Sequence, residues 1–82
     1  METRTELTVW AVTRDTRSSG SDVLSIWDTH KGARTELKLF AEKFNERIGF
    51  EWLGDDIFTF SNGDEMITMS VKRFPIHSEV KY

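Results

Sequence analysis

The apolar residues of segment 30–48 recur with the period of an α-helix, and this pattern constrains the fold more than any other feature. At ~100° per residue they fall within an arc of about 100°, the width of a stripe that faces a core. The residues of this stripe are Ala33, Leu37, Phe40, Ala41, Phe44 and Ile48. Asp28 and Thr29 offer N-cap side chains before it, and Gly49 suits the left-handed position after it. The sequence therefore predicts a helix over this segment, with Leu39 exposed on its outer side.

Four segments rich in β-branched and aromatic residues flank the predicted helix, and we expect each to form a strand. They are 7–13, 23–27, 57–61 and 64–74. Between the last two stands an Asn-Gly pair, the strongest short-range signal for a β-hairpin. A two-residue turn there pairs Ser61 with Asp64 and places Phe58 opposite Ile67. The core face of this hairpin is then Phe58, Phe60, Ile67, Met69 and Val71.

The remaining segments are expected to connect or terminate these elements. Residues 1–6 are polar and are predicted to be a frayed end, and 14–21 is predicted to be a loop. Residues 50–56 are predicted to be a packed connection. Pro75 is expected to end the last strand, because it lacks the backbone N–H. The tail, 75–82, is expected to form no more than a short edge strand.

These elements predict one α+β domain spanning residues 1–82. Its order is β-β-α-β-β, with a two-layer arrangement of a four-stranded antiparallel sheet and one helix on one face. Numbered as they occur in the chain, the strands fit two orders. A right-handed crossover permits 2-1-3-4, and insertion of the last strand at the centre gives 2-1-4-3.

The composition excludes several classes of protein. The 82 residues contain no Cys, which excludes a disulfide scaffold, a thiol nucleophile and a cysteine zinc site. The longest apolar run, 9–12, is too short to cross a membrane, and no apolar segment typical of a signal peptide follows the first residues. We therefore expect a cytoplasmic protein with no membrane contact, no metal and no other cofactor. A small chain rich in aromatic residues also favours a binding module over an enzyme.

The sheet face that the helix leaves uncovered is the main candidate for binding. If Thr13 lies opposite Asp22, the first two strands separate their side chains into two sets. The set expected beneath the helix is Val9, Ala11, Leu24 and Ile26. The set expected on the uncovered face is Trp10, Val12, Val23, Ser25 and Trp27. An exposed apolar face with two Trp residues is typical of an interface, so we expect it to bind a second copy, as a homodimer, or another protein. The alternative is that the tail or the connection carrying Trp52 covers it.

Basic residues offer an alternative site for an anionic ligand or nucleic acid. Arg14 and Arg17 flank the serine-rich loop, and Lys31, Arg34 and Lys38 share one flank of the predicted helix. The chain carries a net charge of −3, which disfavours binding to phosphate backbones. Nucleic acid is therefore the less favoured partner.

No residues stand at a spacing that indicates catalysis. Asp55 and Asp56 are adjacent, and neighbours on an extended chain point to opposite faces, so we expect a solvated turn rather than an acid/base pair. His30 and His77 have no acidic partner or Ser nucleophile at a recognisable spacing, and both are expected at the surface. We predict no catalytic residues and no enzymatic activity.

The front half of the chain, about 7–44, resembles small proteins found in bacteria and their phages. The motifs that carry the resemblance are Val9-x-x-Val12-Thr13, Ser18-Ser19 and Asp22-Val23-x-x-Ile26-Trp27-Asp28-Thr29. Where those proteins often have an acidic residue early in the helix, this chain has Lys31 and Gly32. The resemblance carries no known activity, and implies a phage or mobile-element accessory protein. We therefore expect a module that binds protein and modulates or inhibits a host or defence factor.

Overall fold

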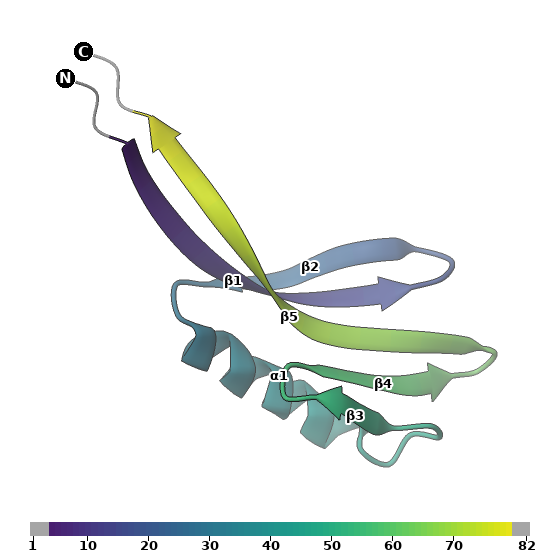
Figure 1. The fold of residues 1–82 in the computed structure, drawn as a ribbon. Coiled ribbons are helices and arrows are strands. Elements are labelled where there is room, and N and C mark those ends of the chain that lie inside the picture. Colours follow the sequence, from purple (N-terminus) through teal and green to yellow (C-terminus); the bar gives the residue numbers. More distant parts are fainter. Residues whose placement is uncertain (1–3, 80–82) are drawn as a thin grey trace.

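The computed structural model describes residues 4–79, and the side chains of residues 8–75. Its elements in chain order are β1 (Arg4–Thr16), β2 (Gly20–Trp27), α1 (His30–Phe44), β3 (Glu51–Gly54), β4 (Ile57–Asn62) and β5 (Glu65–Glu79). The strands form one antiparallel sheet in the order β2-β1-β5-β4-β3, and α1 lies along one of its faces (Figure 1). The predicted α+β class, with one helix and an antiparallel sheet, is confirmed.

The sheet has five strands rather than the predicted four. The additional strand is β3, which pairs with β4 where a plain connection was expected. It is short, and its register shifts between Trp52 and Gly54, so it lacks the regular alternation that identifies a strand in a sequence. β5 lies at the centre beside β1. Of the two predicted orders, the structure therefore has the one that inserts the last strand centrally.

Helix α1 begins where the sequence predicts but ends earlier. The Thr29 hydroxyl accepts a hydrogen bond from the Gly32 N–H at 3.0 Å, which caps the first turn. The helix ends at Phe44 rather than at Ile48, whose side chain is 84% exposed. Beyond the helix the chain turns back, and the Ile48 carbonyl accepts a hydrogen bond from the Ser61 N–H at 2.7 Å. A continued helix would prevent this bond, so Ile48 is not part of the core stripe.

The core lies between α1 and the sheet face that carries the largest apolar side chains. Its buried members are Val12, Ala33, Leu37, Ala41, Phe58, Phe60, Ile67 and Met69. Partly buried around them are Trp10, Trp27, Phe40, Phe44, Phe50 and Val71. The predicted core face of the β4–β5 hairpin is confirmed by this set.

The face of β1 and β2 that meets the helix is the opposite of the predicted one. Trp10, Val12, Ser25 and Trp27 share a face, as expected, but that face lies beneath α1. The reason is that small residues on the helix match large side chains on this face of the sheet. The helix presents glycine and alanine here, and Gly32 lies so close to Trp27 that an added Cβ would be 2.7 Å from ring atom Cε3. Small residues on the helix leave room for two indoles beneath it.

Gly32→Ala should destabilise the protein, although alanine normally stabilises a helix by about 1 kcal/mol over glycine. The new Cβ would lie 2.7 Å from Trp27 Cε3 and 3.0 Å from Thr29 Oγ1. The indole is held in place because its Nε1 donates to Ser25 Oγ at 2.8 Å. Overpacking costs about 1–3 kcal/mol, so we expect a net loss of roughly 1 kcal/mol in the free energy of unfolding in urea. A gain in stability would show that the indole shifts aside at little cost.

The β4–β5 hairpin keeps the predicted faces but not the predicted register. Asn62 pairs with Glu65, so the turn consists of the two residues between them. Phe58 consequently lies opposite Met69, two positions further along β5 than expected. Gly63 is the first turn residue and has a φ of +67°, which a type II′ turn requires at that position. The asparagine of the Asn-Gly pair therefore belongs to the strand.

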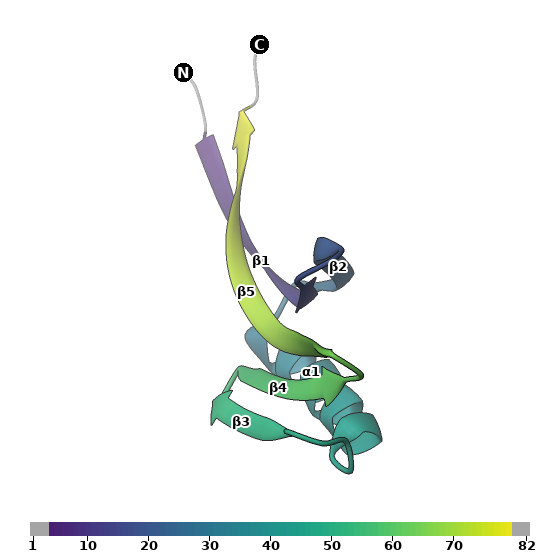
Figure 2. The ribbon, with the colours of Figure 1, turned by 90° about the vertical axis from the view of Figure 1, so that its right-hand side faces the viewer.

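β1 and β5 continue beyond the other strands as a two-stranded ribbon, which we call the arm. It consists of residues 4–9 paired with 74–79. Figures 1 and 2 show it rising away from α1, β3 and β4. β2 pairs with β1 only from Trp10 onwards, and β4 pairs with β5 only as far as Ser70. Within the part of the chain that the structure describes, both outer edges of the arm are therefore unpaired.

The arm replaces a frayed end and a tail that the sequence predicted. β5 runs through Pro75 instead of ending there, since proline fits a strand edge where its nitrogen faces away from the partner strand. The predicted loop at 14–21 is also shorter, because β1 extends to Thr16 and β2 begins at Gly20. Residues 1–3 and 80–82 lie outside the described residues.

Candidate protein interface

The arm makes the protein elongated. The principal extents are 56 × 26 × 16 Å, and the radius of gyration is 15.8 Å. A compact domain of this length has a radius of gyration of about 12 Å. A two-stranded ribbon without a third strand or a covering helix is only marginally stable in water. The arm is therefore a structure that gains from contact with another surface.

The sheet face opposite α1, which we call the open face, carries exposed apolar side chains where the arm leaves the domain. Four residues form this group, which we call the apolar patch: the exposed Val23, Ile26 and Phe74 and the partly buried Val9. Ile26 lies opposite Ala11, and Phe74 lies opposite Val9, so the patch spans three adjacent strands. Ile26 is 65% exposed and Phe74 is 44% exposed. Clustered exposure of this kind is typical of an interface.

A β-bulge in β2 brings Val23 into the apolar patch. Residues three positions apart in a strand normally point to opposite faces. Thr13 pairs with Val23 and Ala11 pairs with Ile26, so Leu24 is an additional residue that shifts the register. The shift returns Val23 to the open face, where it is 57% exposed.

The centre of the open face is polar, and its groups are already paired. Thr13 Oγ1 and Ser70 Oγ are 3.1 Å apart in a buried hydrogen bond between β1 and β5. Lys72 Nζ lies 3.3 Å from Asp15 Oδ2. A hydrogen bond from the Ser21 hydroxyl, together with Lys72, lowers the pKa of Asp15 against the opposing effect of desolvation. Because these groups satisfy one another, the apolar patch is the part of the open face that gains most from burial.

Most of the interface predicted from the sequence lies inside the protein. Val12 is 0% exposed, and Trp10 and Trp27 pack partly buried against the core. Ser25 accepts the hydrogen bond from the Trp27 indole. The cover is α1 itself, rather than the tail or Trp52. Of the predicted set, only Val23 is on the open face, because the bulge in β2 turns it there.

The predicted anion-binding residues fall in two separate places. Arg14 Nη2 pairs with Asp22 Oδ2 at 3.0 Å, and Arg17 is exposed in the turn between β1 and β2. This turn lies at the end of β2 away from α1 (Figure 1). The other three residues gather on one flank of α1 around an open pocket of about 450 Å³: Lys31, Arg34 and Lys38. The two groups therefore do not form one basic surface.

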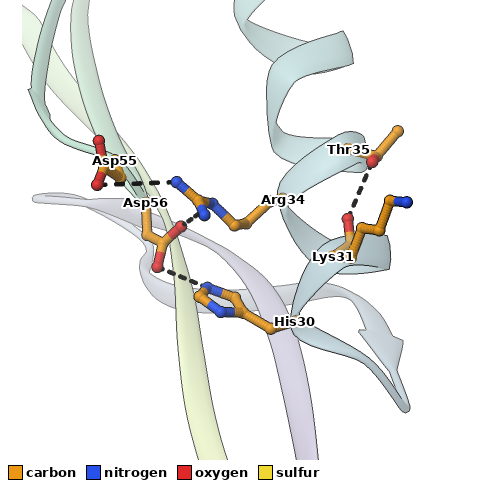
Figure 3. Close-up of polar contacts among 6 residues, drawn as sticks. All are labelled: His30, Lys31, Arg34, Thr35, Asp55 and Asp56. Carbon is orange, nitrogen blue, oxygen red and sulfur yellow. Dashed lines mark hydrogen bonds and ion pairs between the residues drawn. The ribbon is translucent and has the colours of Figure 1, made fainter.

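A polar network that no sequence pattern indicates joins α1 to the turn between β3 and β4 (Figure 3). His30 Nε2 lies 2.7 Å from Asp56 Oδ2, and Arg34 Nε lies 2.9 Å from Asp56 Oδ1. Arg34 Nη2 lies 3.8 Å from Asp55 Oδ2. The Trp10 ring stacks on the imidazole with centroids 4.2 Å apart. Both aspartates reach one guanidinium because they occupy a turn, where the alternation expected of an extended chain does not hold.

Comparisons with known proteins add no family to this description. No family model, curated protein or solved structure gives a significant match to the chain. In the residues that the structure describes, no helix is long and apolar enough to cross a membrane. The function is therefore inferred from the surfaces of the molecule.

The polar network acts as a structural tie between three elements. His30 connects α1 to β1 through Trp10 and to the β3–β4 turn through Asp56. The Asp56 carbonyl also accepts a hydrogen bond from the Val71 N–H at 2.9 Å, which links the same turn to β5. Arg34 Nε and Asp56 Oδ1 are close but not aligned for a hydrogen bond, so their contact is an ion pair. The Asp56 carboxylate is thereby occupied by the His30 imidazole and the Arg34 guanidinium.

Proposed function

We propose that the protein is a non-enzymatic module that binds protein, and that its first partner is a second copy of the chain. The observation that carries the proposal is the arm with the apolar patch at its root. The open face of the arm and the patch are adjacent, so one partner surface can cover both. Covering them would give the ribbon a second layer to pack against and remove apolar side chains from water.

A second copy fits this surface because of symmetry. A sheet face can pack against its own copy about a two-fold axis, since the same patch then lies on both sides of the contact. The two open faces would then meet and bury both apolar patches, as in stacked sheets about 10 Å apart.

A module of this kind acts by occupying a surface. Together with the resemblance to small bacterial and phage proteins, this extends the proposal to an accessory protein that binds and modulates a host or defence factor. The alternative, nucleic-acid binding through the basic residues, has less support. Arg14 and Arg34 are already paired with carboxylates, and the chain is acidic overall.

Ile26→Asp should convert a dimer into a monomer. The wild-type protein is expected to show about twice its chain mass of 9.6 kDa by light scattering behind a sizing column, at both low and high salt. An aspartate at the centre of the buried patch would leave an unpaired charge, which is strongly unfavourable. Because Ile26 is exposed in one copy, the variant should still fold, as circular dichroism can verify.

The matched control is Leu39→Asp, which places the same charge at an exposed apolar residue on the outer side of α1. This variant should keep the wild-type mass. A wild-type protein that is monomeric at high concentration would contradict the proposal. So would a folded Ile26→Asp variant that remains dimeric.

A further inference from the structure

A second surface lies on the helix side of the sheet, between α1 and β3. Two open pockets of about 450 and 530 Å³ meet there at Lys38, and we call them together the flank groove. Its basic half contains Lys31 and Arg34, and its aromatic half contains Phe50 and Trp52. The flank groove is on the opposite side of the sheet from the apolar patch, so the two surfaces can be occupied independently.

One wall of the flank groove is a strand edge that is free to pair. β3 is the last strand of the described sheet, with β4 on one side and no described strand on the other. All of its residues are exposed. An exposed edge presents backbone N–H and C=O groups that an extended peptide can bind by adding a strand.

The aromatic half of the groove provides a fixed apolar contact. Trp52 is 40% exposed, and its ring rests on Phe58 with centroids 5.2 Å apart. Phe50 holds it from the side in an edge-on contact at 6.2 Å. Across the groove, Ala41 leaves space on the helix. A strand added beside β3 would point every second side chain towards this space, where an apolar residue would contact the indole.

The basic half of the groove carries positive charge that the protein does not neutralise. Arg34 is paired with Asp56. By contrast, Lys31 and Lys38 form no ion pair with any described residue. Their Cα atoms are about 10 Å apart along the helix, which is the span of a few residues of an extended chain. This half is therefore complementary to carboxylates.

We propose that the flank groove binds an extended acidic segment of a partner protein, which adds a strand to β3. Its apolar side chain would contact Trp52, and its carboxylates would face Lys31 and Lys38. A peptide is favoured over nucleic acid because the edge of β3 offers backbone partners that only a peptide can use.

Selection from a displayed library of random peptides, followed by fluorescence anisotropy with the enriched peptides, tests this proposal. We expect enriched sequences that combine acidic residues with an apolar one. The double variant Lys31→Glu, Lys38→Glu should weaken their binding by at least roughly tenfold. Lys43→Glu is the matched control, because Lys43 lies over Phe40 on the other flank of α1, and it should bind normally. Proline at the centre of the peptide should abolish binding, since it disrupts strand addition.

Three results would overturn the proposal. The first is a library without enriched peptides, and the second is binding that survives the lysine reversals. The third is a single-stranded oligodeoxythymidine probe that binds more tightly than any enriched peptide, which would assign the groove to nucleic acid. The Ile26→Asp variant should retain peptide binding, so this proposal and the one on self-association can fail separately.

Discussion

Replacing both Trp10 and Trp27 with alanine should unfold the protein rather than only separate its copies. Trp→Ala in a full core costs about 3–5 kcal/mol, and these partly buried residues should each lose about half of that. The sum approaches the lower end of the ~5–15 kcal/mol that keeps a small domain folded. The Trp10 substitution also removes the ring that stacks on His30. Far-UV circular dichroism and urea denaturation would measure it.

The control for this experiment is Trp52→Ala, which removes an indole from the edge strand and should leave the protein folded. If the Trp10→Ala, Trp27→Ala variant is folded and monomeric, these residues form the interface that the sequence predicts. That result would also mean that α1 does not need the indoles beneath it.

Leu37→Ala should lower the free energy of unfolding by about 2–5 kcal/mol. The side chain is 0% exposed and lies at the centre of the helix stripe, so its removal leaves a cavity. Leu39→Ala makes the same chemical change two residues away, where the side chain is 51% exposed, and should cost no more than about 0.5 kcal/mol. Because the two substitutions alter helix propensity equally, their difference in urea isolates the packing. Equal losses would contradict the orientation of α1.

The periodic features of the fold could be predicted because they follow from local geometry. The helix stripe at Ala33 and Leu37 predicts which side of α1 is buried, and the exposure of Leu39 follows from the same period. The alternation at Phe58 and Met69 likewise predicts their common face. The turn register was wrong because Gly63 serves a type II′ turn, which needs a positive φ at its first residue.

The features that depend on distant contacts could not be predicted in the same way. Which face of β1 meets α1 is decided by the fit between Gly32 and Trp27, and the separation of the two sets of side chains is equally good for either face. His30 and Asp56 are far apart in the chain and form no spacing motif, so their contact emerges only in the folded protein. The arm requires Pro75 to lie within a strand, whereas a proline in a sequence usually indicates that a strand ends.

The central position of β5 has a consequence for how the protein is made. Of the described strands, β5 is the last to be synthesised, although it pairs with β1, and the pair Arg4↔Glu79 joins opposite ends of the described chain. The sheet therefore cannot close until β5 has been synthesised, and pairing of such remote segments is slow. Until β5 arrives, the apolar side of α1 lacks the part of the sheet that Ile67 and Met69 provide. During this interval the chain has the exposed surface that chaperones recognise, and its folding competes with aggregation.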